Sequence, residues 1–373
     1  MPDVLLNDFK RQWTETADAV LSAVARVGES GWYVLGPEVE RFERELAGVW
    51  RRRHVVGCAS GLDAIELALR ALGVAAGAKV LTTPLSAFAT TLAILRAGAV
   101  PVFVDVDEHG LIDLARCREA LEADPTIRTL VPVHLYGQAV DLVELARLRD
   151  GFQLTVVEDC AQALGATSHG LPVGSVGQAA ATSFYPTKNL GALGDGGALA
   201  TDDEAVAARG RALRDYGQTA KYVHDLLGLN SRLDELQAAV LRDAFLPRLA
   251  RWTERRAAIA ETYHARLAHP SVRPLPSPAA SRGVWHLFPV LVPPPSRDAF
   301  VRHLAARGVR TGVHYPRLIT DQQALAGQPF HVRGELRRAA AIAGGEVSLP
   351  IHPYLHDAEL QRVIDAVNEW TGA

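Results

Sequence analysis

The sequence is poor in cysteine and contains no long hydrophobic run. Its three cysteines, Cys58, Cys117 and Cys160, include no CxxC pair, so neither a zinc site nor a disulfide framework is predicted, and we expect no bound metal. No apolar stretch approaches the length of a membrane span and the first residues hold no apolar signal core, so we expect a cytoplasmic protein without a membrane partner. With 39 basic and 42 acidic residues, the net charge of -3 argues against a nucleic-acid partner.

From about residue 54 to residue 202, short apolar segments alternate with helical patterns. Several of these segments are runs of β-branched residues, as in strands that are covered on both faces. This alternation predicts an α/β fold with a mostly parallel sheet of seven strands. The predicted strands are His54–Cys58, Lys79–Thr82, Val100–Val104, Thr129–His134, Leu154–Glu158, Ala180–Phe184 and Gly197–Thr201, and the predicted helices are Gly61–Leu72, Ala87–Ala97, Leu114–Leu121 and Leu142–Arg149.

The pattern changes near residue 231, where a long helical segment begins. We therefore divide the chain into a large domain, residues 1–230, and a smaller C-terminal α+β domain, residues 231–373. The smaller domain is predicted to contain a helix over Arg232–Leu267 with a break at Pro247, strands over Trp285–Val292 and Val309–Val313, and helices over Arg297–Arg307 and Ala358–Trp370.

An acidic pair ends one of the predicted strands. Asp159 follows an apolar run, and ligands of open α/β sheets bind at the carboxyl ends of the strands. A carboxylate in this place is able to keep a pyridine nitrogen protonated, which makes the ring a better electron sink. Gln162, three residues further on, is near enough to reach a neighbouring ring substituent. The alternative role for Asp159 is to cap a following helix.

A single lysine follows the next strand, in a segment that then becomes rich in glycine. Burial would lower the pKa of the Lys188 amine and suit it to react with an aldehyde cofactor. Ser183, five residues earlier, offers a hydroxyl group to a phosphate. The alternative is a solvated lysine in a surface loop. A phosphate-binding P-loop is not indicated, because the pattern GxxxxGK[ST] is absent here.

Two further segments also lie between a strand and a helix. Ser60 and Gly61 precede a helix, whose free backbone N–H groups and dipole would attract a phosphate; simple helix capping by Ser60 is the alternative. Phe88 follows the next strand, where its ring could stack on a flat aromatic cofactor or lie in the core like any other phenylalanine.

Taken together, these segments resemble the DegT/DnrJ/EryC1/StrS sugar aminotransferases, which have the aspartate-aminotransferase (type I) fold and use pyridoxal 5'-phosphate. Motifs in a common order over most of the chain carry the resemblance. They are GPEVERFERELA (36–47), SGLDAIELAL (60–69), VPVHLYGQAVDL (131–142), VVEDCAQALGA (156–166), SFYPTKNLGALGDGGAL (183–199) and LNSRLDELQAA (229–239).

The resemblance implies a role for each residue of the cofactor site. Lys188 would hold pyridoxal phosphate as a Schiff base and serve as acid and base, and Asp159 would support the ring nitrogen. Gln162 would lie near the phenolic oxygen, Ser183 would bind the phosphate, and Phe88 would stack on the ring.

Two positions bear on the phosphate site. The family often has Gly-Thr where this chain has Gly61-Leu62, so we expect the phosphate contact to come from backbone N–H groups of Ser60, Gly61 and Leu62 or from the turn at Asp63. Asn230 matches an asparagine that reaches the phosphate of the neighbouring subunit, which implies a homodimer with shared active sites. A helix start capped by Ser231 explains the same segment, and both interpretations can hold together.

The implied reaction moves an amino group from L-glutamate to a nucleotide-linked keto sugar. The sequence around Lys188 is similar to members that aminate 3-keto sugars, so we favour C3 of a dTDP-3-keto-6-deoxyhexose. A UDP-linked 3-keto sugar and C4 of a 4-keto sugar are the alternatives. We expect His314, Tyr315, Arg317 and Tyr185 to contact the substrate, although a strand end with a turn-forming proline explains the segment around residue 315 equally well.

Two rival interpretations remain open. One is a regulator that binds the cofactor without turnover. The other is a different pyridoxal-phosphate enzyme of the same fold, either an aldolase or a desulfurase. A desulfurase needs a reactive cysteine in a loop, whereas the three cysteines lie beside or within predicted elements, where buried thiols are inert.

Overall fold

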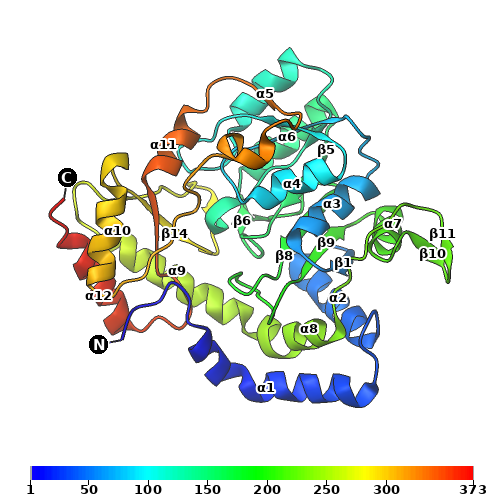
Figure 1. The fold of residues 1–373 in the computed structure, drawn as a ribbon, viewed down its shortest axis with the longest axis horizontal. Coiled ribbons are helices and arrows are strands. Elements are labelled where there is room, and N and C mark those ends of the chain that lie inside the picture. Colours follow the sequence, from blue (N-terminus) through cyan, green and yellow to red (C-terminus); the bar gives the residue numbers. More distant parts are fainter. Residues whose placement is uncertain (1, 373) are drawn as a thin grey trace.

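The computed structural model describes residues 2–372, in which one eight-stranded sheet forms the centre of the larger part of the fold (Figure 1). All seven predicted strands are present, although the one predicted over Thr129–His134 is limited to its first two residues, and an eighth is added at one edge by the C-terminal third of the chain. In spatial order the strands are β1 (His54–Cys58), β9 (Gly197–Thr201), β8 (Ala179–Ser183), β5 (Thr155–Asp159), β4 (Thr129–Leu130), β2 (Lys79–Thr82), β3 (Val100–Phe103) and β15 (His331–Val332).

Seven of these strands run in one direction. Only β9 is antiparallel to its two neighbours, β1 and β8. The carboxyl ends of β1, β5 and β8 therefore lie at the same edge of the sheet, which is where an open α/β sheet binds its ligands.

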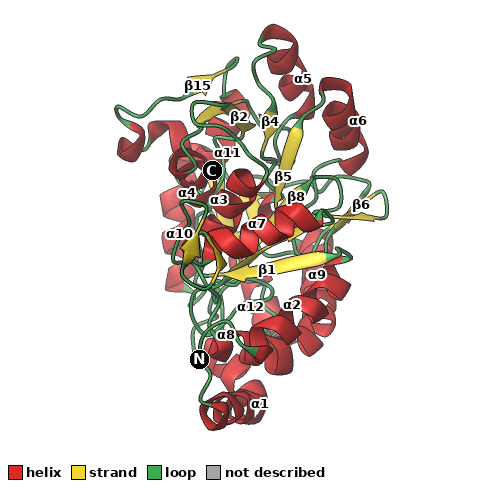
Figure 2. Ribbon diagram, turned by 90° about the vertical axis from the view of Figure 1, so that its right-hand side faces the viewer, coloured by secondary structure: helices red, strands yellow, loops and turns green. Residues whose placement is uncertain are grey.

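Helices cover both faces of this sheet, as the continuous apolar strands require (Figure 2). On one face, α3 and α7 pack on β1, β8 and β9; elsewhere α2 packs on β1, and α1 and α2 pack on α8. The helices before residue 240 are α1 (Phe9–Ser30), α2 (Pro37–Trp50), α3 (Gly61–Ala71), α4 (Phe88–Arg96), α5 (Leu114–Ala123), α6 (Leu142–Phe152), α7 (Glu204–Arg214) and α8 (Glu235–Val240).

The predicted helix over residues 232–267 is divided into several pieces. After α8 come a π-helical turn (Leu241–Phe245) and a 3-10 turn (Leu246–Arg248) that contains Pro247, so the break expected there is confirmed. The long helix α9 (Leu249–Arg266) then leads away from the sheet to the C-terminal elements (Figure 1).

A smaller sheet and three helices form the C-terminal part of the fold. The sheet, α9 and two of these helices enclose a second apolar core, in which Val4 from the N-terminal segment also lies; the third helix, Arg337–Gly345, buries its apolar residues in the core under the larger sheet. The sheet has the order β12 (Arg273–Pro274), β14 (Phe288–Leu291) and β16 (Glu346–Leu349), and the helices are α10 (Arg297–Ala306), α11 (Arg337–Gly345) and α12 (Asp357–Asn368). Two short sheets complete the fold, with β13 (Ser281–Arg282), β6 (Thr167–Ser168) and β7 (Leu171–Pro172) in one and β10 (Gln218–Ala220) and β11 (Val223–His224) in the other.

The strand predicted over residues 309–313 is wrong. Val309 forms an isolated parallel bridge with Val4, and Gly312 forms an isolated antiparallel bridge with Ser348. The two ends of the segment therefore bond to different neighbours, and no continuous ladder forms along it.

Apolar packing crosses the boundary that was placed at residue 231. Leu233 and the residues of α8 lie in the core that also contains α1 and α2. Leu275, Leu318 and Ile342 lie in the core under β2–β5. The division into residues 1–230 and 231–373 remains a prediction, while the cores show that C-terminal segments complete the larger part of the fold.

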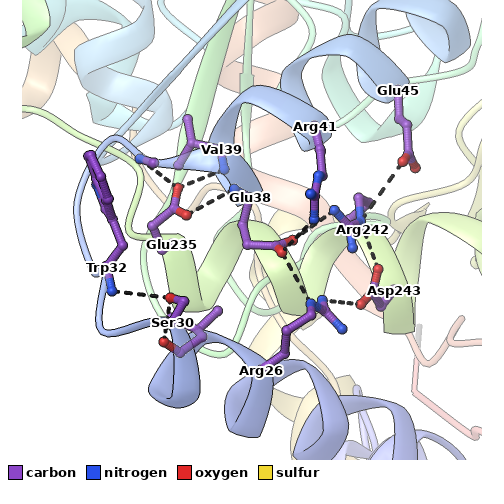
Figure 3. A network of polar contacts seen from close by, with 12 residues as sticks. Arg26, Ser30, Trp32, Glu38, Val39, Arg41, Glu45, Glu235, Arg242 and Asp243 are labelled. Atoms are coloured by element: carbon purple, nitrogen blue, oxygen red, sulfur yellow. Dashed lines mark hydrogen bonds and ion pairs between the residues drawn. The ribbon is translucent and has the colours of Figure 1, made fainter.

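The helix start predicted at Ser231 is also wrong, because α8 begins at Glu235. The Ser231 hydroxyl instead donates to Asp63 at 2.9 Å and accepts the backbone N–H of Ala59 at 3.1 Å. Glu235 accepts three backbone N–H groups at the start of α2, from residues 36, 38 and 39, at 2.8–2.9 Å (Figure 3). Glu235, the first residue of α8, therefore caps the N-terminus of α2.

Within residues 2–372, the structure contains no helix with the length and apolar character needed to cross a membrane.

Candidate active site

A cavity of about 260 Å³ lies at the carboxyl ends of β5 and β8, beside the first turns of α3 and α4. Most of the residues predicted for the cofactor site line it together, although they come from three separate segments of the chain. The predicted residues in its wall are Ser60, Gly61, Leu62, Asp159, Gln162, Ser183, Tyr185 and Lys188.

Asp159 ends β5, and its carboxylate is held from two sides. The Thr90 hydroxyl donates to Oδ2 at 2.7 Å, and the backbone N–H of Ala161 donates to Oδ1 at 3.0 Å. Asp159 is 5% exposed, so its charge acts in a mostly dry environment. Such a carboxylate is suited to hold a positively charged ring nitrogen.

Lys188 lies five residues beyond the end of β8 and also lines the cavity. Burial lowers the pKa of its amine to about 8, while the nearby charge of Asp159 acts in the opposite direction. Roughly a tenth of the amine is therefore neutral at pH 7, and the neutral amine is the form that attacks an aldehyde.

One end of the cavity is suited to a phosphate. The hydroxyl oxygens of Ser60 and Ser183 accept backbone N–H groups, from Asp63 at 3.1 Å and from Tyr185 at 3.2 Å, which leaves both hydroxyl protons free to donate. Gly61 lets the two serines approach, because a Cβ at this position would lie 2.5 Å from the Cβ of Ser183. The N-terminus of α3 adds the helix dipole.

The Gln162 amide is oriented by two tyrosines. Its Oε1 accepts the backbone N–H of Tyr136 at 2.7 Å, and its Nε2 donates to the Tyr315 hydroxyl at 3.3 Å. The hydroxyl of Tyr136 in turn donates to the backbone carbonyl of His314 at 2.7 Å. The side chain predicted near the ring oxygen is thus joined to the segment predicted to bind the substrate.

Five predicted residues are not in the wall of this cavity. Phe88 packs against the apolar cluster of Phe103, Ile319 and Leu325, so stacking of Phe88 on the ring gains no support. Asn230 is exposed, and its backbone bridges to residue 215. Arg317 is exposed as well. Tyr315 reaches the cavity through its hydrogen bond with Gln162, and the His314 side chain lies close enough to Lys188 for the lysine charge to lower its pKa.

Two residues of the site, Thr90 and Asp195, were missed from the sequence, and the contact that Tyr136 makes with Gln162 was not predicted. Thr90 and Tyr136 position Asp159 and Gln162, and Asp195 adds an exposed carboxylate to the cavity wall. Thr90 lies two residues after Phe88, in a segment already singled out, but nothing in its spacing shows a contact to β5. Tyr136 contacts Gln162 through its backbone N–H, and because nearly every residue type has this group, the sequence does not reveal the contact.

A buried group of His134, Glu158 and Cys160 has the composition of a metal site. Its polar atoms are already in use, however. His134 lies 2.9 Å from Glu158 and accepts the N–H of residue 140 at 3.1 Å, and Glu158 also accepts three backbone N–H groups at 2.6–2.8 Å. Burial raises the pKa of Cys160 well above its usual value. The group anchors β5 rather than offering open ligand positions.

The residues fit a flat aldehyde cofactor with a ring nitrogen and a phosphate. The cavity offers a partly neutral amine at Lys188 for the aldehyde and a carboxylate at Asp159 for the nitrogen. At its other end it presents the two serine hydroxyls and a helix N-terminus for the phosphate.

Comparison with known proteins agrees with this arrangement. The DegT/DnrJ/EryC1/StrS aminotransferase family matches residues 15–368. A Streptomyces venezuelae protein named dTDP-3-amino-3,4,6-trideoxy-alpha-D-glucose transaminase is 44% identical over 99% of this chain and 96% of its own. The EryC1 protein of Saccharopolyspora erythraea, named for sensory transduction in erythromycin biosynthesis, is 44% identical over 97% of this chain and 98% of its own. A UDP-N-acetyl-3-dehydro-alpha-D-glucosamine 3-aminotransferase of Acidithiobacillus ferrooxidans is 37% identical over 96% of each chain.

The fold is shared as well. The crystal structure of Streptomyces venezuelae DesV in complex with a ketimine intermediate superposes with a TM-score of 0.94 over 99% of each chain, at 44% identity. The expected type I aminotransferase fold and the expected cofactor, pyridoxal phosphate, are both confirmed. The chain belongs to the DegT/DnrJ/EryC1/StrS family of pyridoxal-phosphate-dependent aminotransferases.

Proposed function

We propose that this enzyme moves an amino group from L-glutamate to C3 of a dTDP-3-keto-6-deoxyhexose. The observation that carries the aminotransferase chemistry is the single cavity that holds the Lys188 amine, the Asp159 carboxylate and the hydroxyls of Ser60 and Ser183. A family member without a lysine at this position could not perform both halves of a transfer. The family that this chain resembles also contains dehydratases with histidine at this position, so Lys188 favours transamination.

Each residue has a separate task in this proposal. Lys188 anchors the cofactor covalently between turnovers, and its Nζ then moves the proton at the reacting carbon of the amino donor, which its pKa of about 8 permits. Asp159 keeps the ring nitrogen protonated. With one amide proton already donated to Tyr315, Gln162 would donate the other to the ring oxygen, and the Ser183 hydroxyl would donate to the phosphate. The cofactor, when bound, supplies the electron sink that the side chains lack.

The choice of sugar rests on similarity. The Streptomyces relative is named for a dTDP-linked 3-amino sugar, and it aligns over nearly the whole of this chain. The Acidithiobacillus relative, named for a UDP-linked sugar, keeps a UDP-linked 3-keto substrate as an alternative; C4 amination is a further one. Tyr185, which is 51% exposed beside Lys188, and His314, Tyr315 and Arg317 are the residues that we propose to contact the nucleotide sugar.

A panel of substrates tests this proposal. The holoenzyme is incubated with L-glutamate and with dTDP- or UDP-linked 3-keto and 4-keto sugars, and the amine is identified by mass and NMR. We expect a 3-amino dTDP-sugar. Amination at C4, or of the UDP sugars alone, would reject the proposed substrate but retain the enzyme class.

We also propose that the active enzyme is a homodimer with shared sites. Asn230 is exposed on its own chain, and Tyr222 and Leu227, which are 81% and 92% exposed, offer apolar surface in the preceding segment. The three cysteines are unpaired, which supports the cytoplasmic location that we propose, since a reducing compartment keeps thiols free.

The regulator remains a second candidate, because the EryC1 relative is named for sensory transduction. Spectroscopy distinguishes the two. An enzyme with its cofactor on Lys188 shows a visible absorbance band that borohydride removes and that L-glutamate shifts. A protein whose band does not respond to any amino donor would favour the regulator.

A further inference from the structure

A buried carboxylate lies behind the segment that we propose to contact the sugar. Glu346 is the first residue of β16, is fully buried, and forms no salt bridge with any residue between 2 and 372. Its Oε1 accepts the Ser348 hydroxyl at 2.5 Å, and its Oε2 accepts the backbone N–H of His314 at 2.6 Å. An ionisable group in such a place is costly to bury, and an apolar residue would serve packing better.

The chain of contacts continues from Glu346 to an imidazole. The Ser348 hydroxyl lies 2.9 Å from Nδ1 of His314. Side chains alternate along a strand, so Glu346 and Ser348 share one face of β16 while Val347 and Leu349 enter the C-terminal core. Glu346, Ser348 and His314 thus form a continuous path of polar atoms, which we call the Glu-Ser-His relay.

The backbone fixes the geometry of the Glu-Ser-His relay. Gly312 and Ser348 exchange two backbone hydrogen bonds, of 3.1 and 2.9 Å. A Cβ at residue 312 would lie only 2.6 Å from Cε1 of His314, so the ring is packed directly against the glycine. This packing holds the imidazole of His314 in hydrogen-bond contact with the Ser348 hydroxyl.

A serine hydroxyl has one proton, and this restricts how the path can be protonated. When Glu346 is ionised, it only accepts, so Ser348 donates to it and accepts Nδ1–H from His314; the Nε2 atom then carries a lone pair. When Glu346 is protonated, its proton goes to the Ser348 oxygen and the hydroxyl donates to Nδ1. The Nε2 atom then carries the proton.

Both states are within reach near neutral pH. Burial raises the pKa of Glu346 to about 7, against the hydrogen bonds that it accepts and the charge of Arg297. The other titratable groups that interact with it are the hydroxyls of Tyr136 and Tyr315, which burial keeps neutral because it raises the pKa of both.

The imidazole itself stays neutral in both states. Burial and then the charge of Lys188 lower the pKa of His314 to about 4, and His286 also faces it. A change at Glu346 therefore alters which nitrogen of His314 carries the proton, without charging the ring.

We propose that Glu346 and Ser348 are positioning residues that set the tautomer of His314, so that its Nε2 offers the sugar either a lone pair or a proton. The inference rests on the proposed function, in which His314 meets the substrate. In one direction a substrate proton passes to Nε2, the Nδ1 proton passes to the Ser348 oxygen, and the hydroxyl proton passes to Glu346. One proton is moved in total, and the return path is the same series reversed.

Two variants of equal shape at position 348 test the relay. Ser348→Thr keeps a hydroxyl, whereas Ser348→Val adds the same bulk without one. We expect kcat/KM for the nucleotide sugar to fall about 10- to 100-fold further in the valine variant than in the threonine variant. The half-reaction with the amino donor, followed by the visible band, should differ little between the two. Equal kcat/KM values for the sugar in both variants would overturn the relay.

A measurement without substrate separates the relay from the choice of sugar. In holoenzyme labelled with ¹⁵N-histidine, and with His314→Gln used for assignment, we expect the His314 proton to move from Nδ1 to Nε2 as the pH falls through about 7. Glu346→Gln should hold it on Nε2 at every pH, because the amide oxygen is needed to accept the backbone N–H of His314, which leaves the amide nitrogen to donate to Ser348. A tautomer that is the same in both proteins at all pH values would reject the relay, whereas failure of the sugar panel would reject only the proposed substrate.

Discussion

In the proposed mechanism, Nζ of Lys188 both binds the cofactor covalently and transfers the proton. Replacing Lys188 with alanine or arginine removes a neutral amine from the cavity, so we expect the rate of transamination to fall by about 10⁴-fold or more. The rate of amine formation and the visible band of the cofactor measure the effect. Lys10→Ala, an exposed lysine in α1, is the matched control and should retain wild-type turnover. Near-normal turnover in either Lys188 variant would contradict the assignment.

The same residue gives the enzyme a pH dependence. Since the pKa of Lys188 is about 8, the fraction of neutral amine is roughly 1% at pH 6 and rises until the pH passes 8. We expect capture of pyridoxal phosphate by the cofactor-free protein to accelerate over this range and then level off, as followed by stopped-flow absorbance. Asp159→Asn removes the charge that raises this pKa and should move the midpoint to lower pH. A midpoint that moves upward would show that another group controls the step.

Neighbouring threonines in α4 allow a controlled test of the support for Asp159. The Thr90 hydroxyl donates to Asp159, whereas the Thr91 hydroxyl is buried and, within residues 2–372, has no hydrogen-bond partner. Thr90→Val should weaken cofactor binding by about 10-fold, as removal of a residue that orients a ligand usually does. Thr91→Val keeps the same shape change and should leave cofactor affinity unaltered. Equal cofactor affinities in the two variants would show that the hydrogen bond from Thr90 to Asp159 does not contribute to cofactor binding.

At the level of elements, the start of α2 depends on a side chain from α8. The two oxygens of Glu235 satisfy three N–H groups that the helix cannot bond itself (Figure 3). Glu235→Gln replaces one accepting oxygen with a donor, so we expect the free energy of unfolding to fall by about 2–3 kcal/mol in denaturant titrations. Glu261→Gln, on the exposed side of α9, should change it by less than about 0.5 kcal/mol. If both variants lowered the free energy of unfolding by the same amount, Glu235 would not act as a cap of α2.

The elements that could be predicted from the sequence are those with a repeating apolar pattern. The seven strands of the main sheet and helices such as α3 and α6 fall in this class. The eighth strand, His331–Val332, is too short to show any alternation and forms only because the edge of β3 is free to bond. The segment over 309–313 looks apolar enough for a strand, but its partners differ at its two ends.

The residues of the site also divide into those that a sequence pattern reveals and those that only the folded structure reveals. Residues that bear chemistry at strand ends, such as Asp159 and Lys188, could be found from their motifs, and the structure brings them together. Contacts between distant segments could not be found, because they depend on the fold. Thr90 against Asp159 and the backbone of Tyr136 against Gln162 are of this kind. Stacking of Phe88 on the ring is predicted from its place after a strand and from the resemblance, and its packing against Phe103 does not support it.

For the whole molecule, the shared site makes a test by mixing possible. Lys188→Ala and Asn230→Ala variants should each be impaired alone, since the lysine and the asparagine of one site belong to different subunits in our proposal. When the two variants exchange subunits, half of the dimers are mixed and each has one intact site, so activity should return to about a quarter of the wild-type value. Light scattering should show a dimer throughout. A mixture that stays as inactive as its components would argue against shared sites.

The edge strand β15 limits how this protein can be dissected or recombined. It covers the open side of β3 with residues from the C-terminal third of the chain, and Val4 pairs with Val309. A fragment that ends before α9 would uncover a sheet edge, which invites aggregation. A chimera that takes its C-terminal half from a relative would likewise import the strand that closes the sheet. Exchange of the segment around His314 is therefore best confined to that segment, so that new specificity can be introduced without replacing part of the scaffold.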